Sequence, residues 1–247
     1  MRARYAISNI AAIGRPGRCG PVSYLHGLPI VGGSAGDDLK FERTHILHDG
    51  RFVTNAASLV LFETSLPFAP FKFQHFERTN IRFVVTGAEP SQRLITEIDG
   101  YPAASRYAEL LNVAVDTLGY TIFSRNPLTI SVAGEEYIRS IQRINEDGSL
   151  GLYSAIDEGI VLRIGHGVDP LNAAERAFAS VRQVVGNPQL IVGFDCVLRR
   201  LELAETGHLK SIEKTFMDNN VVGFCTYGEQ FNGLHINQTF TGVALGY

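Results

Sequence analysis

The chain has 247 residues, of which 45% are hydrophobic and 19% charged, so it is long and apolar enough to bury a core in one large domain or two smaller ones. A formal net charge of -3 with scattered Lys and Arg argues against nucleic-acid binding. No apolar run approaches the ~20 residues of a membrane-spanning helix, which excludes an integral membrane protein. The first residues lack a secretory pattern, and the few scattered cysteines fit a reducing compartment, so we expect a cytoplasmic protein.

The first part of the chain reads as an irregular start followed by strands. Residues 1–27 are rich in Gly and Arg, which predicts irregular structure. Apolar runs separated by turns then predict a meander of strands at 28–31, 44–47, 57–62, 81–86 and 93–98. Asp49-Gly50 is a typical hairpin turn between two of them. Pro102 suits the first turn of a helix, which we expect Gly119 to close.

The second part returns to strands and ends with helices between strands. Residues 128–164 predict an antiparallel group, and Asp169-Pro170 predicts the start of a helix that Gly186 stops. A strand at 190–194, a helix at 203–219, a strand at 221–224 and an antiparallel finish over 235–245 follow. The fold class is α+β (mixed α/β), with two related lobes of mostly antiparallel or mixed sheet packed with helices. We expect the lobes at 28–122 and 123–247, after the irregular start.

Two similar strands near the carboxyl terminus predict a ligand site. Ile191-Val-Gly-Phe-Asp-Cys196 and Val221-Val-Gly-Phe-Cys225 flank a helix, so they should be parallel neighbours whose carboxyl ends meet at one edge of the sheet. Ligands favour that edge. The alternative is an internal set of salt bridges closing the end of a core. The candidate ligand contacts beyond the two strands are Asp195, Cys196, Arg199, Tyr227, Glu229 and Gln230, with Asn237 and Gln238 from the last strand.

The segment Gly32-Gly-Ser-Ala-Gly36 supports two further hypotheses. It matches the Gly-x-Ser-x-Gly turn of serine hydrolases, which predicts an esterase with Ser34 as nucleophile. That turn must lead into a helix, whereas the residues after it read as strand and turn. As a ligand-contacting loop it would offer Gly32, Gly33, Ser34 and Asp37. The carboxylates of Asp37 and Asp38 would repel an anion and better suit an amine or a hydroxyl group.

The histidines and cysteines give weaker predictions. They lack the spacing of a zinc site, so no metal site is expected. A haem needs only one axial side chain, for which His75 and His235 are the first candidates, and a hydrogen-bonded histidine is the alternative for each. Cys196 and Cys225 end the two similar strands and are either a redox pair or buried, inert thiols.

Several motifs in the same order resemble the FIST family of sensory domains. In the carboxyl-terminal half they are residues 193–199, 222–230 and 235–239, and in the other half residues 30–38, 83–86 and 97–103. The resemblance covers residues 28–247 and implies a non-catalytic sensor of bacterial signal transduction that binds a small, amino-acid-like ligand. One branch, the NosP-like nitric-oxide sensors, binds haem and acts on histidine kinases or cyclic-di-GMP enzymes. The family has more chain before the glycine-rich segment, so the first lobe is expected to be shortened.

Overall fold

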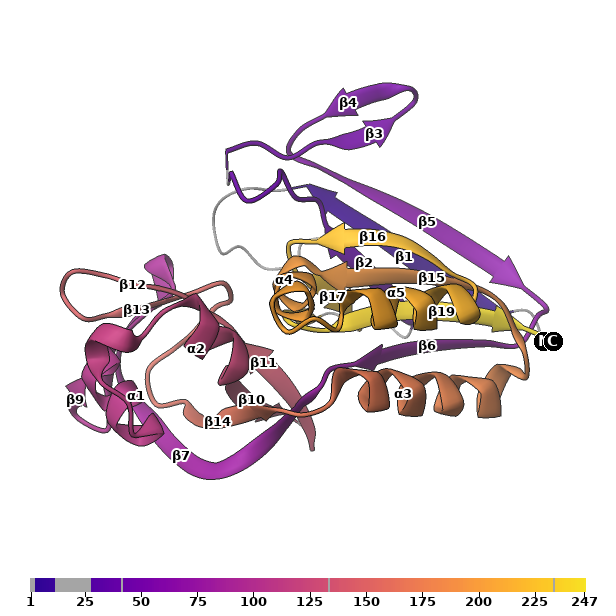
Figure 1. Ribbon diagram of the computed structural model, residues 1–247. Coiled ribbons are helices and arrows are strands. Elements are labelled where there is room, and N and C mark those ends of the chain that lie inside the picture. The colour runs from indigo at the N-terminus through magenta and orange to yellow at the C-terminus, as the bar shows by residue number, and fades with distance from the viewer. Residues whose placement is uncertain (1–2, 12–27, 41, 133, 233) are drawn as a thin grey trace. The chain divides into compact units, whose positions relative to one another are not determined.

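A computed structural model describes residues 3–11, 28–40, 42–132, 134–232 and 234–247 (Figure 1). The chain forms two compact units. Unit 1 comprises Met1–His75 and Asp169–Tyr247, and unit 2, Phe76–Val168, is inserted between those two segments. The expected lobes at 28–122 and 123–247 were consecutive, whereas the compact units are nested, because unit 1 builds its sheets from strands of both segments.

The first sheet of unit 1 has the strand order β18-β17-β2-β1-β5. Its strands are β1 (Ala3–Ala11), β2 (Ile30–Ser34), β5 (Ala56–Thr64), β17 (Glu229–Phe231) and β18 (Leu234–Ile236). β1 pairs in parallel with β2 and antiparallel with β5. This strand corrects the expectation of an irregular start, since its hydrogen-bonding partners lie far along the chain and local composition does not reveal them. Residues 12–27 lie outside the described part of the chain.

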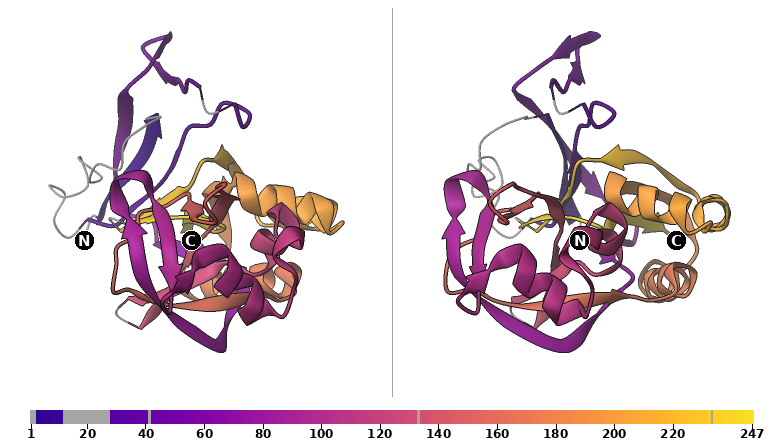
Figure 2. Two further views of the ribbon diagram at one scale, coloured as in Figure 1. Left: turned by 90° about the vertical axis from the view of Figure 1, so that its left-hand side faces the viewer. Right: turned by 60° about the vertical axis from the view of Figure 1, so that its left-hand side comes forward.

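A short hairpin joins β2 to β5. Its strands are β3 (Ile46–His48) and β4 (Arg51–Val53), and it stands away from the sheets of unit 1 in both views of Figure 2. Asp49 and Gly50 have φ angles of 47° and 73°, which is the left-handed geometry of a two-residue hairpin turn. The turn predicted at Asp49-Gly50 is therefore confirmed.

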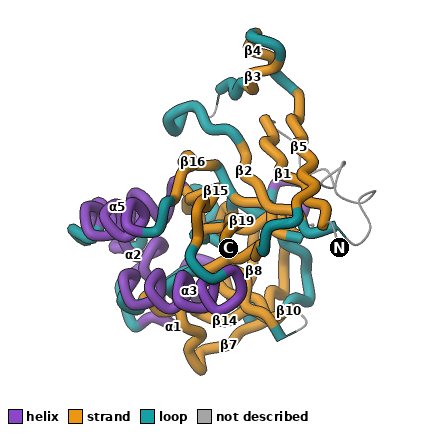
Figure 3. Tube along the Cα trace, turned by 90° about the vertical axis from the view of Figure 1, so that its right-hand side faces the viewer, coloured by secondary structure: helices purple, strands orange, loops and turns teal. Residues whose placement is uncertain are grey.

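The second sheet of unit 1 has the strand order β16-β15-β19-β6. Its strands are β6 (Phe68–Phe73), β15 (Pro188–Cys196), β16 (Val221–Thr226) and β19 (Phe240–Gly246). One face is covered by helices, of which α3 and α5 lie side by side in Figure 3, and β2 and β17 of the first sheet pack against the other face. The covering helices are α3 (Pro170–Val185), α4 (Val197–Glu205) and α5 (Leu209–Asp218).

The helices of unit 1 agree with the sequence in one case and differ in another. The Asp169 side chain accepts hydrogen bonds from two backbone N–H groups at the start of α3, and the helix ends before Gly186, as predicted. The single helix expected at 203–219 is instead two helices, α4 and α5. The break contains Gly207 at a φ of 76°, a left-handed conformation that a continuous right-handed helix cannot contain.

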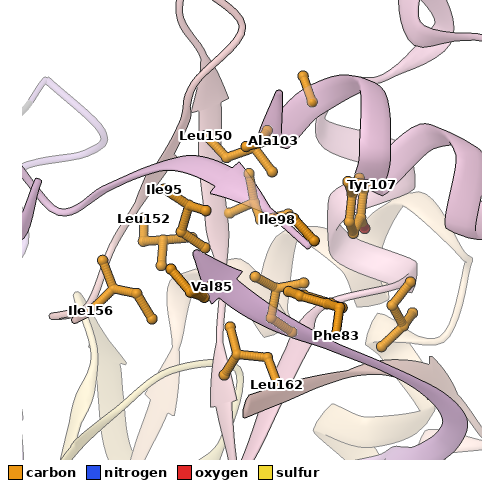
Figure 4. Packing of buried hydrophobic residues seen from close by; sticks show 14 of the residues in the cluster. Phe83, Val85, Ile95, Ile98, Ala103, Tyr107, Leu150, Leu152, Ile156 and Leu162 are labelled. Carbon is orange, nitrogen blue, oxygen red and sulfur yellow. The ribbon is translucent and has the colours of Figure 1, made fainter. Parts of the chain in front are cut away.

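Unit 2 is an eight-stranded sheet with two α-helices and its own core. Side chains from β7, β8, β13 and β14 meet those of α1 in Figure 4. The strands are β7 (Phe76–Glu89), β8 (Leu94–Ile98), β9 (Tyr101–Pro102), β10 (Leu128–Val132), β11 (Glu135–Arg139), β12 (Ile141–Ile144), β13 (Leu150–Leu152) and β14 (Val161–Gly167). The helices are α1 (Ala103–Leu111) and α2 (Tyr120–Arg125), with single 3-10 turns η2 (Pro90–Gln92) and η3 (Val115–Thr117).

Helix α1 ends earlier than the sequence predicted. Asn112 has a φ of 56° and its backbone N–H bonds back to Ala108 and Glu109, so it terminates the helix well before Gly119. Asparagine tolerates this left-handed conformation, which is why it serves here in place of glycine. The α+β fold class is confirmed.

Candidate functional site

The two similar strands near the carboxyl terminus are parallel neighbours, as predicted. β15 and β16 pair in register, with Gly193 opposite Gly223 and Phe194 opposite Phe224. Figure 1 shows α4 beyond the arrowhead end of β16. A Cβ atom on Gly193 would lie 2.2 Å from the Phe240 ring, so only glycine allows that ring to lie against the strand. The carboxyl ends of both strands therefore lie at one edge, where α4 begins.

A buried ion pair joins the end of β15 to α4. Arg199 Nη1 donates to Asp195 Oδ1 at 2.7 Å, and the Arg199 side chain is 0% exposed. Its guanidinium carbon lies 5.1 Å from the centroid of the Phe73 ring and 5.8 Å from that of Phe216. Burial raises the pKa of Asp195, and the charge of Arg199 opposes that effect. The arginine is thus held by one carboxylate and two aromatic rings.

Further along α4, Glu202 continues this buried cluster. Its Oε1 atom lies 3.0 Å from Nε2 of His75, and both side chains are almost fully buried. Among the described residues, the Nε and Nη2 atoms of Arg199 and the Oε2 atom of Glu202 have no hydrogen-bond partner. Buried polar atoms are normally hydrogen-bonded. These three atoms can therefore bond to a ligand or to ordered water. We call Asp195, Arg199 and Glu202 the α4 cluster, and His75 packs against it through Glu202.

Glu229 forms a second cluster on the other side of the sheet. The hydroxyl groups of Thr226 and Thr239 donate to its Oε1 and Oε2 atoms, each at 2.5 Å. A Cβ atom on Gly33 would collide with Thr226, so this threonine faces β2 and the first sheet. Burial raises the pKa of Glu229 to about 8 in spite of the two hydroxyl donors. The carboxyl group therefore loses its proton at a higher pH than an exposed glutamate does.

The glycine-rich loop docks against the turn after β16. The Ser34 N–H donates to the Gly228 carbonyl and the Tyr227 N–H donates to the Ser34 carbonyl, both at 2.9 Å. The Tyr227 hydroxyl donates to Asp37 Oδ1 at 2.8 Å. A Cβ atom on Gly36 would lie 2.7 Å from the Tyr227 ring. Two segments that the sequence nominated independently are thus in direct contact.

The described residues that follow Ser34 form turns and loop up to β3, without a helix. A hydrolase nucleophile turn must open a helix, because the helix and the turn together present the serine. The esterase hypothesis therefore lacks the local structure that it requires.

The remaining nominated residues lie close to Glu229. Gln230 Nε2 and His235 Nδ1 are 2.7 Å apart, and the backbone of Gln230 pairs with that of Gly32. Asn237 and Gln238 are buried just before β19. Cys196 is also buried, which raises the pKa of its thiol well above the usual range and favours an inert group.

The predicted gathering of Asp195, Arg199, Tyr227 and Glu229 thus separates into two clusters. Asp195 and Arg199 lie with α4 and α5, whereas Glu229 and Tyr227 contact the first sheet and its loop. Asp195 pairs with Cys225 of β16, and the next residue of that strand, Thr226, donates to Glu229. Neighbouring side chains of a strand point to opposite faces, which places the two clusters on different sides of the sheet. Glu202 was missed, because a glutamate in an amphipathic helix normally faces solvent and nothing in the local sequence marks this one as buried.

A pocket of about 210 Å³ lies between the β15–β16 pair and α5. It is lined by Gly193, Asp195, Arg200, Leu209, Ile212, Glu213, Phe216, Val221, Gly223, Phe224, Cys225 and Phe240. Asp195 and Phe216 also contact Arg199, so the guanidinium group lies directly behind the pocket wall. The α4 cluster and this pocket form the candidate site.

A larger hollow of about 410 Å³ lies between β6 and α3. Neither His75 nor His235 lines this hollow or the smaller pocket, and His75 is bonded to Glu202. An axial role for either histidine in haem binding therefore stays a prediction, which these two hollows do not support. Across the described ranges, no three His, Cys, Asp or Glu side chains are grouped to hold a metal ion. No helix in the same ranges is long and apolar enough to cross a membrane.

A fold of this kind, with charged side chains at the carboxyl ends of parallel strands and a pocket beside them, is typical of ligand-binding proteins. The models of two families match the chain: the FIST N domain over residues 22–101 and the FIST C domain over residues 103–232. The chain belongs to the FIST family, whose members are small-ligand sensory domains of signalling proteins.

A curated relative gives less information about function. An uncharacterised protein of Methanocaldococcus jannaschii is 25% identical over 251 aligned residues, which cover 87% of this chain and 48% of the relative. The chain thus spans about half the length of that relative. No solved structure matches the chain.

Proposed function

We propose that this chain is the ligand-binding part of a signalling protein, and that its ligand is a small molecule with both an anionic and a cationic group, as in an amino acid. The observation that carries this proposal is the set of buried, unpartnered atoms in the α4 cluster. Arg199 offers two N–H donors at Nε and Nη2, and Glu202 offers one acceptor at Oε2, none of them paired within the described residues. A carboxylate complements the donors, and an ammonium group complements the acceptor.

The charges of the cluster favour such a zwitterion over a simple anion. Arg199 already faces the carboxylate of Asp195, and Glu202 adds a second carboxylate one helical turn further on. A purely anionic ligand would therefore add a like charge beside two carboxylates, which is unfavourable in a buried setting. A zwitterion leaves the charge of the cluster unchanged.

The neighbouring pocket supplies the space for the rest of the ligand. Its volume of about 210 Å³ and its apolar wall, which includes Phe216 and Phe240, suit a short hydrocarbon side chain. Since Arg199 is fully buried, Asp195 or Phe216 must move aside for the ligand to reach it. This movement would couple occupancy to the conformation of α4 and α5.

The test compares L-alanine with propionate and ethylamine, which carry only its anionic and only its cationic group. We expect L-alanine to raise the melting temperature of the protein in a thermal-shift assay, by an amount equivalent to about 2.7 kcal/mol at a hundredfold excess over Kd. The two single-charge analogues should have little effect. Arg199→Gln and Glu202→Gln should each abolish the response, whereas Arg176→Gln, on the exposed face of α3, should keep it.

Two outcomes would contradict the proposal. If propionate stabilises the protein as well as L-alanine does, the site recognises anions only. If no compound has an effect, ordered water satisfies the α4 cluster and the ligand lies elsewhere. Arg199→Gln removes a buried charge and can therefore unfold the protein. Native mass spectrometry of the wild-type protein with L-alanine detects binding without using this variant.

The output of the sensor passes to a partner protein. The family relationship supports a histidine kinase or a cyclic-di-GMP enzyme in that role, and the scattered cysteines support a cytoplasmic setting. Co-purification from the native host, with and without L-alanine, tests the assignment of a histidine kinase or a cyclic-di-GMP enzyme as the partner.

A further inference from the structure

His75 occupies a special place in the chain, because it is the last residue of unit 1 before the chain enters unit 2. It follows β6, and the next residue begins β7. Its side chain is 2% exposed, and its Nε2 atom lies 3.0 Å from Oε1 of Glu202. A connection between compact units is normally exposed and polar. This one is held from within unit 1 by a buried side-chain contact.

The residues between the pocket and His75 are in continuous contact. Asp195 lines the pocket and bonds to Arg199, and the Arg199 guanidinium lies over the ring of Phe73, which closes β6 just before His75. Glu202, on the same helix as Arg199, reaches His75 directly. The charge of His75 is also close enough to lower the pKa of Asp195. A rearrangement of Arg199 or Glu202 therefore acts on the residues that end unit 1.

We propose that His75 is a positioning residue that transmits ligand occupancy from the α4 cluster to the connection between β6 and β7. This inference rests on the proposed function, because it requires a ligand whose cationic group binds Glu202. That group approaches Oε2 while His75 holds Oε1 of the same carboxylate. The ligand thereby changes the charge that His75 faces and the strength of the contact that anchors the connection.

The test measures hydrogen exchange of the backbone amides of residues 74–78 with and without saturating L-alanine. In the wild-type protein we expect L-alanine to change the exchange rates of this segment at least about fivefold, the lower end of usual coupling between sites. His75→Gln keeps a donor for Glu202 but loses the imidazole ring. It should retain L-alanine binding within about threefold and lose the response at residues 74–78. His166→Gln, an exposed histidine of β14, should behave as the wild type does.

A direct spectroscopic reading accompanies the exchange experiment. The imidazole nitrogen resonances of His75, assigned by their absence in His75→Gln, should shift on addition of L-alanine. If L-alanine binds but neither these resonances nor the exchange at residues 74–78 changes, the relay is wrong and the proposed function stands. The relay is also wrong if His75→Gln keeps the same change in exchange at residues 74–78 as the wild-type protein. If L-alanine does not bind at all, the proposed function fails and the relay fails with it.

Discussion

Glu229 is a buried carboxyl group whose surroundings decide its protonation state. It is 0% exposed, and its two oxygen atoms accept hydrogen bonds from Thr226 and Thr239. The nearby charge of Asp195 adds to the effect of burial in raising its pKa, while the hydroxyl donors oppose it. The folded protein therefore keeps a proton on Glu229 at pH values where an exposed glutamate has lost it.

This protonation makes stability depend on pH. Between the ordinary pKa of 4.5 and the folded-state pKa of about 8, the folded protein binds one proton more than the unfolded chain at Glu229. Stability should then fall as the pH rises through this window, by up to about 1.4 kcal/mol per pH unit, and level off above it. Urea unfolding at a series of pH values measures the slope. Glu229→Gln should flatten it and Glu175→Gln, exposed on α3, should not; an unchanged slope in Glu229→Gln would refute the assignment.

The sequence predicted the residues of the site better than their contacts. Asp195 and Arg199 were recognisable because they follow a strand of distinctive pattern, and they do pair. Glu202 and His75 are 127 residues apart in the chain, and their pairing depends on β6 and α4 meeting in space. No local pattern encodes such a contact, because each of the two residues taken alone is ordinary for its segment.

Helix α3 is the element whose boundaries local chemistry determines most completely. Asp169 Oδ1 accepts from the Leu171 N–H at 2.8 Å and from the Asn172 N–H at 3.4 Å, which satisfies two of the unpaired donors at the helix start. Gly186 ends the helix at a φ of 72°. Both signals are short-range, so the sequence alone was sufficient.

Removal of this cap should cost measurable stability. Asp169→Ala leaves both N–H groups without a side-chain partner, so we expect a loss of about 1 kcal/mol in the free energy of unfolding. Asp169→Asn keeps a capping oxygen, so its free energy of unfolding should fall by much less than that of Asp169→Ala. Chemical denaturation of the three proteins checks the order, and equal losses in both variants would mean that the charge and not the cap stabilises the helix start.

The break between α4 and α5 illustrates the opposite case. The sequence from 203 to 219 has a helical pattern, but Gly207 adopts a left-handed conformation that separates the two helices. Helix α4 packs against β15 and β16, whereas α5 packs against β16 and against α3, and this packing outweighs the local preference for one continuous helix.

At the scale of the whole molecule, unit 2 has the properties of an independently folding domain. Its segment is continuous, its strands form one sheet, and its main core cluster draws only on its own residues. Phe83, Val85, Ile95, Leu150 and Leu162 are buried together in this cluster. By contrast, unit 1 needs both segments of the chain. Strand β19 of the second segment pairs on one side with β15 of the same segment and on the other with β6 of the first.

We therefore expect residues 76–168 to fold when expressed alone. A cooperative thermal transition and a dispersed amide spectrum should be observed for this fragment. Residues 169–247 alone should give neither, because β19 would lack β6 and β17 would lack β2. If the fragment 76–168 is unfolded in native buffer, its core requires contacts from the rest of the chain.

The sequence by itself determined the family, the fold class, most strands, the cap of α3 and the parallel pairing of the two Gly-Phe strands. These features follow from patterns within a few residues, or from two similar motifs flanking a helix, where the chain geometry leaves one arrangement. The tertiary structure alone decided that unit 2 is inserted into unit 1, that Asp195 and Glu229 belong to separate clusters, and that Glu202 is buried against His75. Each of these depends on side chains that meet only when distant strands and helices pack, because burial and pairing are properties of the assembled layers.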